Sequence, residues 1–218
     1  GGVQRRHEEV AGAANAVELI DMTKHRGGHP RMGAADVIPF VPLSGISMDE
    51  VVDLARAFGA ELADALAIPV YLYDRAALSP DRASLAEVRK GEFEGLRDAV
   101  ARGERLPDFG PHEIGSAGAT AVGARKPLVA FNLYLTGSEE YAKEIARSVR
   151  ESSGGLPAVR AIGFAVPERG SVTVSMNLVD IDVTPPRVAF DAVTKLATER
   201  GMEVLSSEIV GLVPAATL

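Results

Sequence analysis

The chain has 218 residues and a formal net charge of −7, and hydrophobic residues make up 46% of it. This length allows one large domain or two small ones, and no apolar run reaches the roughly 20 residues that span a bilayer. The acidic balance argues against nucleic acid as the main partner, because phosphate binding needs clustered cations. Cysteine is absent, which excludes disulfides and zinc–thiolate sites, and we expect a cytoplasmic protein that binds neither membranes nor nucleic acids.

The first half of the chain alternates between helical and strand-like apolar patterns. Apolar spacing predicts a helix over Gln4–Lys24 and then an edge strand over Asp36–Val41, which holds Pro39. Ser47 and Glu50 form a capping box before a helix whose core positions are Val51, Ala55, Phe58, Leu62 and Leu66. Three further features follow in order: a buried strand over residues 69–73, a second capping box at Ser84 and Glu87, and a helix to about Ala101 with a break at Gly91.

Residues 103–123 read as one long loop with little periodicity. Loops of this length inside compact domains are usually functional or disordered. This one holds Phe109, Ile114 and many small residues but few charges, which favours an ordered loop packed against the rest of the protein.

The second half predicts the element order βαββαβ, which is the ferredoxin-like unit. An alternating strand over residues 128–135 precedes a helix capped by Ser138, and Pro167–Gly170 reads as the turn of a hairpin. Pro185 and Pro186 open a second helix, and the last strand falls within residues 202–213. We therefore expect an α/β (α+β) protein of two α/β lobes, residues 1–126 and 127–218, divided near Arg125.

His29 is the first candidate for chemistry. It lies between a glycine pair and a proline, with Arg31 two residues later, and an imidazole can exchange a proton near neutral pH. A loop histidine bonded to the backbone is the alternative. His7 and His25 read as solvated side chains, and His112 lies in the long loop.

Other catalytic patterns are missing from the sequence. No histidine pair has the spacing of a metal site, and no nucleophile elbow or phosphate loop occurs. The glycines of residues 110–118 could let backbone groups approach a flat ligand closely. Arg125 could meet a substrate carboxylate or could be a solvated charge.

Several motifs together resemble the glutamate formimidoyltransferase (formiminotransferase) family. His29-Pro-Arg-Met-Gly33 and the run from Asp36 to Pro42 carry the strongest likeness, and other matching stretches follow in order along nearly the whole chain. They are residues 19–22, 70–73, 107–111, 118–121, 123–126, 130–132 and 211–214.

The resemblance implies transfer of a formimino group from N-formimino-L-glutamate to N5 of tetrahydrofolate, which serves as co-substrate, in a tunnel between two lobes. It makes His29 the catalytic acid and base. Apart from the resemblance, Arg31 and Arg125 are our candidate contacts for a substrate carboxylate. No metal is expected, and a homodimer is implied. The folate-binding residues would be Gly110, Pro111, His112, Glu113, Ile114, Gly115, Ser116, Ala117 and Gly118.

Family members also begin with a strand and a polar loop that supply an acidic partner for the histidine, and they continue beyond Pro214. We therefore expect the printed chain to lack the first strands and the last part of the family's sequence. Two alternatives stay open: a formyltransferase that uses N-formylglutamate or 5-formyltetrahydrofolate, and a folate-binding module without catalysis.

Overall fold

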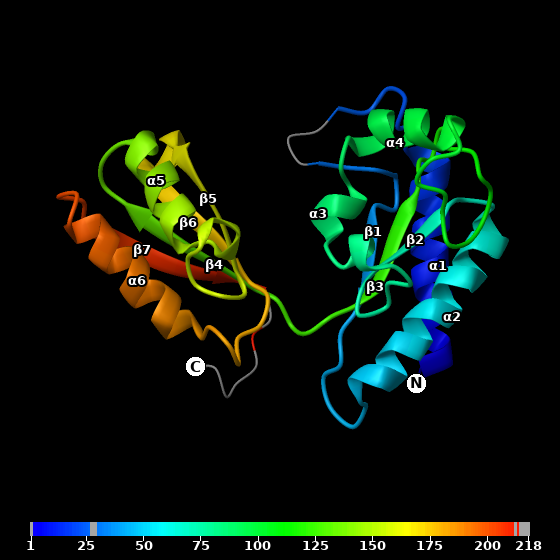
Figure 1. The fold of residues 1–218 in the computed structure, drawn as a ribbon, viewed down its shortest axis with the longest axis horizontal. Helices are drawn as coiled ribbons and strands as arrows, with labels where there is room; N and C mark the ends of the chain where they lie inside the picture. Colours follow the sequence, from blue (N-terminus) through cyan, green and yellow to red (C-terminus); the bar gives the residue numbers. More distant parts are fainter. Residues whose placement is uncertain (1, 27–29, 212, 214–218) are drawn as a thin grey trace. The chain divides into compact units, whose positions relative to one another are not determined.

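A computed structural model of the chain describes residues 2–26, 30–211 and 213. Contacts divide the chain into two compact units, unit 1 (residues 1–125) and unit 2 (residues 126–218), both drawn in Figure 1. In the described part of the chain, every helix is too short or too polar to span a bilayer. The expected mixture of α and β structure in two lobes is confirmed.

Unit 1 is built on a three-stranded parallel sheet. In spatial order its strands are β1 (Val37–Phe40), β3 (Thr120–Ala124) and β2 (Val70–Asp74). All three strands run in the same direction, so their amino ends lie at one edge of the sheet and their carboxyl ends at the other.

β1 lies at the edge of this sheet, as Pro39 predicts. The carbonyls of Asp36 and Phe40 accept hydrogen bonds from β3 and the residue after it, so alternate residues of β1 face β3. Pro39 falls between them and faces away from β3. Its missing N–H therefore removes no hydrogen bond from the ladder.

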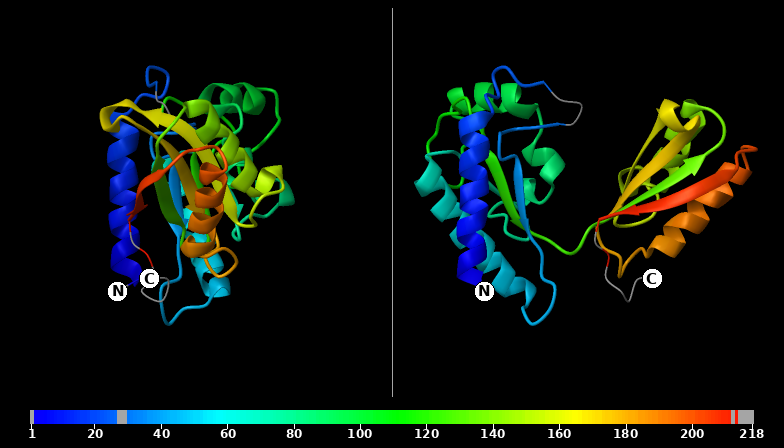
Figure 2. Two further views of the ribbon diagram at one scale, coloured as in Figure 1. Left: turned by 90° about the vertical axis from the view of Figure 1, so that its left-hand side faces the viewer. Right: turned by 180° about the vertical axis from the view of Figure 1, so that it is seen from behind.

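Helices cover both faces of the unit 1 sheet. α1 (Gly2–Leu19) and α2 (Met48–Leu66), which lie side by side in Figure 2, pack on one face. α3 (Leu85–Val88) and α4 (Glu92–Ala101) pack on the other, and a short 3₁₀ turn, η1 (Pro80–Arg82), precedes them. The result is a three-layer α/β/α arrangement with two hydrophobic clusters.

The sequence locates α2 well. The Ser47 hydroxyl accepts from the Glu50 N–H at 3.2 Å, and the Glu50 carboxylate accepts from the Ser47 N–H at 2.8 Å, which confirms the capping box. The expected core positions are buried except Leu66, which is half-buried at the last turn.

The prediction of one loop over residues 103–123 is wrong at its end, because Thr120–Ala124 is the central strand of the sheet. This strand reads Thr-Ala-Val-Gly-Ala and is buried throughout. A Cβ on Gly123 would lie 2.4 Å from the Tyr73 ring, so the strand needs small residues to pass beneath it. Small residues and an internal glycine hide a strand from pattern analysis.

Two helix boundaries also differ from the prediction. α1 ends at Leu19 rather than Lys24. The prediction of a second capping box is wrong, because the Ser84 side chain makes no capping hydrogen bond. α3 is a single turn, and the N–H groups of Glu87 and Val88 donate to the Ser84 carbonyl. The break at Gly91 is confirmed, since this glycine has a φ of 80° before α4 begins.

Unit 2 has the expected βαββαβ order. Its antiparallel strands lie in the order β5-β6-β4-β7, and the elements are β4 (Val129–Leu135), α5 (Glu139–Val149), η2 (Glu151–Ser153), β5 (Val159–Val166), η3 (Pro167–Arg169), β6 (Ser171–Leu178), α6 (Pro186–Thr198) and β7 (Val204–Val210).

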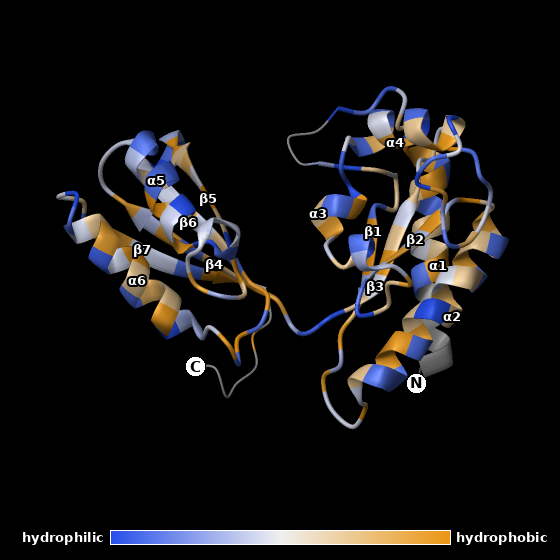
Figure 3. Cartoon of the chain, in the orientation of Figure 1, coloured by the Kyte–Doolittle hydropathy of each residue, from blue (hydrophilic) through white to orange (hydrophobic). Residues whose placement is uncertain are grey.

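Both long helices of unit 2 bury one side against the sheet. Figure 3 shows hydrophobic and hydrophilic residues mixed along α5 and α6. The buried hydrophobic residues of both helices form one cluster with the buried residues of the strands. Ser138 caps α5 through the Tyr141 N–H. Gly163 of β5 lets α5 approach closely, because a Cβ there would lie 2.3 Å from the backbone of Ala142.

Candidate functional site

Two segments that the sequence singles out meet in unit 1. The Ala34 N–H donates to the Ala117 carbonyl at 2.8 Å, and the Ala119 N–H donates to the Met32 carbonyl at 2.9 Å. The chain just after residues 27–29 is therefore hydrogen-bonded to the end of the predicted folate loop. His29 itself lies outside the described residues.

Two glycines make this backbone junction possible. A Cβ on Gly33 would lie 2.1 Å from the Ala119 carbonyl oxygen, and a Cβ on Gly118 would lie 2.3 Å from the Met32 carbonyl oxygen. Gly118 also has a φ of +75°, in the left-handed region that other residues avoid. Any side chain at either position would push the two segments apart.

The predicted folate loop is anchored to the rest of unit 1 by one buried side chain and a backbone hydrogen bond, while most of its residues are exposed. Ile114 is buried in the same cluster as Met32, and the Ser116 carbonyl accepts from the Met22 N–H at 2.8 Å. The residues around Ile114 are exposed, namely Gly110, Pro111, His112, Glu113, Gly115 and Ser116, whereas Ala117 is half-buried and Gly118 is buried. The loop therefore presents its polar side chains and glycine backbone to solvent from a fixed base.

Asp36 shapes the turn between the junction and β1. Its carboxylate accepts from the N–H groups of Met32 at 2.6 Å and Gly33 at 3.3 Å, and Arg89 binds its second oxygen. Aspartate side chains commonly stabilise turns by bonding to nearby backbone N–H groups. The sequence singled out Asp36 only as part of a motif and gave no sign of Arg89.

Arg31 is held by the start of α4. Its guanidinium binds both oxygens of Glu94, at 2.8 and 3.0 Å, and one oxygen of Glu92 at 2.8 Å. Its carbonyl accepts from the Phe93 N–H, and Arg31 is only 9% exposed. The hydrogen bonds from Arg31 lower the pKa of Glu94 to about 2. A contact between Arg31 and a substrate carboxylate stays a prediction. In the structure the Arg31 guanidinium binds Glu92, Glu94 and the His25 carbonyl.

Arg125 lies at the opposite end of the sheet from the junction. Gly118 precedes the amino end of β3 and Arg125 follows its carboxyl end. Six residues, five of them in the strand, therefore separate the two, a span of roughly 20 Å. The Arg125 side chain interacts with Tyr73, and burial raises the pKa of Tyr73 while Arg125 opposes this shift. Unit 1 therefore does not bring Arg125 to the predicted folate loop.

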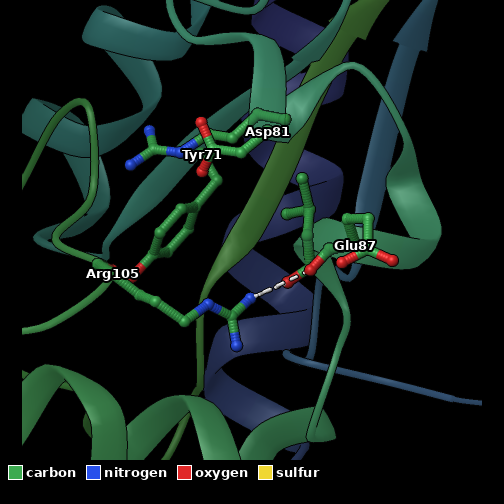
Figure 4. Close-up of a pocket in the computed structure, with 6 residues that line it drawn as sticks. Tyr71, Asp81, Glu87 and Arg105 are labelled. Carbon is green, nitrogen blue, oxygen red and sulfur yellow. Dashed lines mark hydrogen bonds between the residues drawn. The ribbon is translucent and has the colours of Figure 1, made fainter.

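A polar hollow of about 40 Å³ lies beside Tyr71 and is drawn in Figure 4. Arg105 reaches across it to the carbonyls at the end of α3, including that of Val88 at 2.6 Å, and the Tyr71 hydroxyl donates to the Arg105 carbonyl at 2.7 Å. The Arg82 guanidinium pairs with Asp108 and lies over the Tyr71 ring, 5.2 Å from the ring centre. Arg105, Tyr71 and Arg82 thus have partners within the protein, and a space of this size holds only a few water molecules. We therefore assign no ligand to this hollow.

The described residues also bear on metal binding. Within residues 2–26, 30–211 and 213, no group of three His, Asp or Glu side chains is arranged to hold a metal ion.

Comparison with known proteins covers both units. A family model described as the formiminotransferase domain, N-terminal subdomain, matches residues 5–125, and the formiminotransferase domain matches residues 130–218. The chain is 46% identical over 211 residues to the glutamate formimidoyltransferase of Thermoplasma acidophilum, covering 95% of this chain and 70% of that protein. The corresponding enzyme of Streptococcus pyogenes is 43% identical over 205 residues, or 93% and 69% of the two chains.

Longer relatives also match. The formimidoyltransferase-cyclodeaminase of Mus musculus is 45% identical over 213 residues, which cover 94% of this chain. The chain spans 39% of the length of that protein.

Proposed function

Because the chain belongs to the formiminotransferase family, we propose that it transfers the formimino group of N-formimino-L-glutamate to N5 of tetrahydrofolate. His29 is the general acid and base of this reaction. The exposed residues of the loop at 110–118 contact the folate, and the active protein is a homodimer.

The reaction needs one proton to be taken and one to be given. As N5 of tetrahydrofolate attacks the formimino carbon, a C–N bond forms and N5 loses its proton. As the bond between that carbon and the glutamate nitrogen breaks, the departing amine gains a proton. A single imidazole that titrates near neutral pH can accept the first proton and deliver the second.

The junction between residues 32–34 and 117–119 is the observation that carries this proposal. Its two backbone hydrogen bonds and two glycines join the segment that follows His29 to the loop assigned to folate. Residues 32–34, shortly after His29 in sequence, and residues 117–119 are thus neighbours in the fold although about 80 residues separate them in sequence, which supports the proposal.

Turnover tests the proposal directly. L-Glutamate release from N-formimino-L-glutamate is measured with and without tetrahydrofolate, on the 218 residues and on a version that carries whatever the natural gene encodes before Gly1. We expect release that depends on tetrahydrofolate. Faster turnover of N-formyl-L-glutamate would favour a formyltransferase, and folate binding without turnover in both versions would favour a binding module.

A His29→Ala variant tests the assigned base. We expect kcat to fall by roughly 100-fold or more, the range that positioned acids and bases supply. His7→Ala, the same substitution in α1, is the matched control and should change kcat by less than about twofold, as is usual for sites away from the chemistry. An unchanged rate in His29→Ala would remove His29 from its role.

A further inference from the structure

Glu94 binds arginines on both sides of residues 27–29. One of its oxygens, Oε1, accepts from Arg31 Nη2 at 2.8 Å and from Arg26 Nη1 at 3.4 Å, and Oε2 accepts from Arg31 Nη1 at 3.0 Å. Arg26 is the last described residue before residues 27–29, and Arg31 follows Pro30. A single carboxylate thus joins the chain that enters this segment to the chain that leaves it.

Glu94 and the nearby acid Glu92 differ in the arginines that they pair with. Glu92 contacts Arg31 but makes no hydrogen bond or ion pair with Arg26. Arg31 is also fixed by its main chain, since its carbonyl accepts from the Phe93 N–H at 2.8 Å, and its guanidinium donates to the His25 carbonyl at 3.0 Å. Among the described acids, Glu94 alone pairs with both arginines.

The form of the contact favours a geometric role. A bidentate pair between a guanidinium and a carboxylate fixes the plane and direction of both groups. The Glu94 side chain is 44% exposed and that of Arg31 is 11% exposed. Glu92 also binds the Arg31 guanidinium, so replacing Glu94 leaves Arg31 with one carboxylate partner but removes the link to Arg26. Because Arg31 holds the pKa of Glu94 far below neutrality, the carboxylate stays ionised and is unsuited to give a proton.

We propose that Glu94 is a positioning residue, which holds Arg26 and Arg31 together and thereby fixes the ends of the segment that carries His29. This inference rests on the function proposed above. Fixing the ends of a short segment reduces the conformations open to it, and catalysis is sensitive to small displacements of a reacting group. Arg31 acts here through the segment and needs no contact with substrate.

Steady-state kinetics of Glu94→Gln tests the role. The amide keeps the shape of the side chain but loses the charge, so we expect kcat to fall roughly tenfold while KM changes by less than about twofold, since an interaction made in the transition state is lost. Glu104→Gln is the matched control, because Glu104 is an exposed acid that pairs with Arg102. It should leave kcat and KM unchanged.

Two further variants separate charge from geometry. Arg31→Lys keeps the charge but loses the fork, so it should lower kcat about as much as Glu94→Gln. Glu92→Gln should lower it less, because Glu92 does not reach Arg26. Unchanged kcat in Glu94→Gln, or a fall fully explained by a smaller folded fraction, would overturn the proposal.

A second readout does not depend on turnover. Amide hydrogen exchange at Phe93 and Ala34 reports on two backbone hydrogen bonds, Phe93 N–H to the Arg31 carbonyl and Ala34 N–H to the Ala117 carbonyl. Both bonds hold the chain that follows residues 27–29. Faster exchange in Glu94→Gln than in Glu104→Gln supports the positioning role, and equal exchange contradicts it. If neither the 218 residues nor the version extended before Gly1 shows transferase activity, the proposed function fails, while exchange still decides whether Glu94 orders the backbone after the segment.

Discussion

Gly33→Ala is the substitution that best tests the backbone junction. The added Cβ would lie 2.1 Å from the Ala119 carbonyl oxygen, whereas a relaxed contact between carbon and oxygen is about 3.3 Å. The two segments must therefore separate by about 1 Å. Both atoms that clash belong to the backbone or are fixed to it, so no rotation of a side chain relieves the contact.

The expected loss of stability follows from the bonds beside the glycine. Separation weakens the Ala34–Ala117 and Ala119–Met32 hydrogen bonds, each worth about 1 kcal/mol net. Strain from overpacking adds about 1–3 kcal/mol. We expect the free energy of unfolding to fall by about 3 kcal/mol and Tm by roughly 10 °C.

Calorimetry and urea unfolding measure both quantities. Gly12→Ala is the matched control, because Gly12 is an exposed position of α1 with no atom within 4 Å of the added Cβ. That variant should be stabilised by about 0.5–1 kcal/mol, since alanine favours a helix over glycine. A Gly33→Ala protein as stable as the unmodified chain would refute the close approach of the two segments.

Two other predictions concern charge and packing. Glu94 has a folded pKa of about 2 against an ordinary value of 4.5, so its stabilisation is complete above pH 4.5 and disappears as the pH falls toward 2. The difference in Tm between the unmodified chain and Glu94→Gln should therefore narrow over this range, and a constant difference would contradict the pairing with Arg31. Gly163→Ala should destabilise unit 2 by about 1–3 kcal/mol in urea unfolding, because its Cβ would meet the α5 backbone at Ala142. Ile162→Ala, at a neighbouring side chain that is 55% exposed, should cost much less, and equal losses would show that the helix does not lie so close.

Local patterns were enough for much of the fold. The capping box at Ser47 and Glu50, the cap at Ser138 and the βαββαβ order of unit 2 are all set by interactions between near neighbours or by regular apolar spacing. The edge position of β1 follows from Pro39, which cannot donate a hydrogen bond. These features need no knowledge of distant contacts.

The central strand of unit 1 escaped sequence analysis for a physical reason. Thr120–Ala124 is buried on both faces and lies between two strands, so it needs small residues rather than an alternating pattern. Ser84 shows the reverse error, since a capping sequence is present but the helix that follows is too short to use the side chain. In both cases the surrounding structure outweighed the local preference.

The candidate site divides in the same way. The sequence by itself nominated His29 and the loop at 110–118, because glycines, prolines and an imidazole have local properties that can be read from the chain. Only the tertiary structure placed Glu94 on both Arg26 and Arg31, and joined Gly33 to Gly118. Such contacts depend on how the backbone brings together residues that are more than 60 positions apart, and no local pattern carries that information.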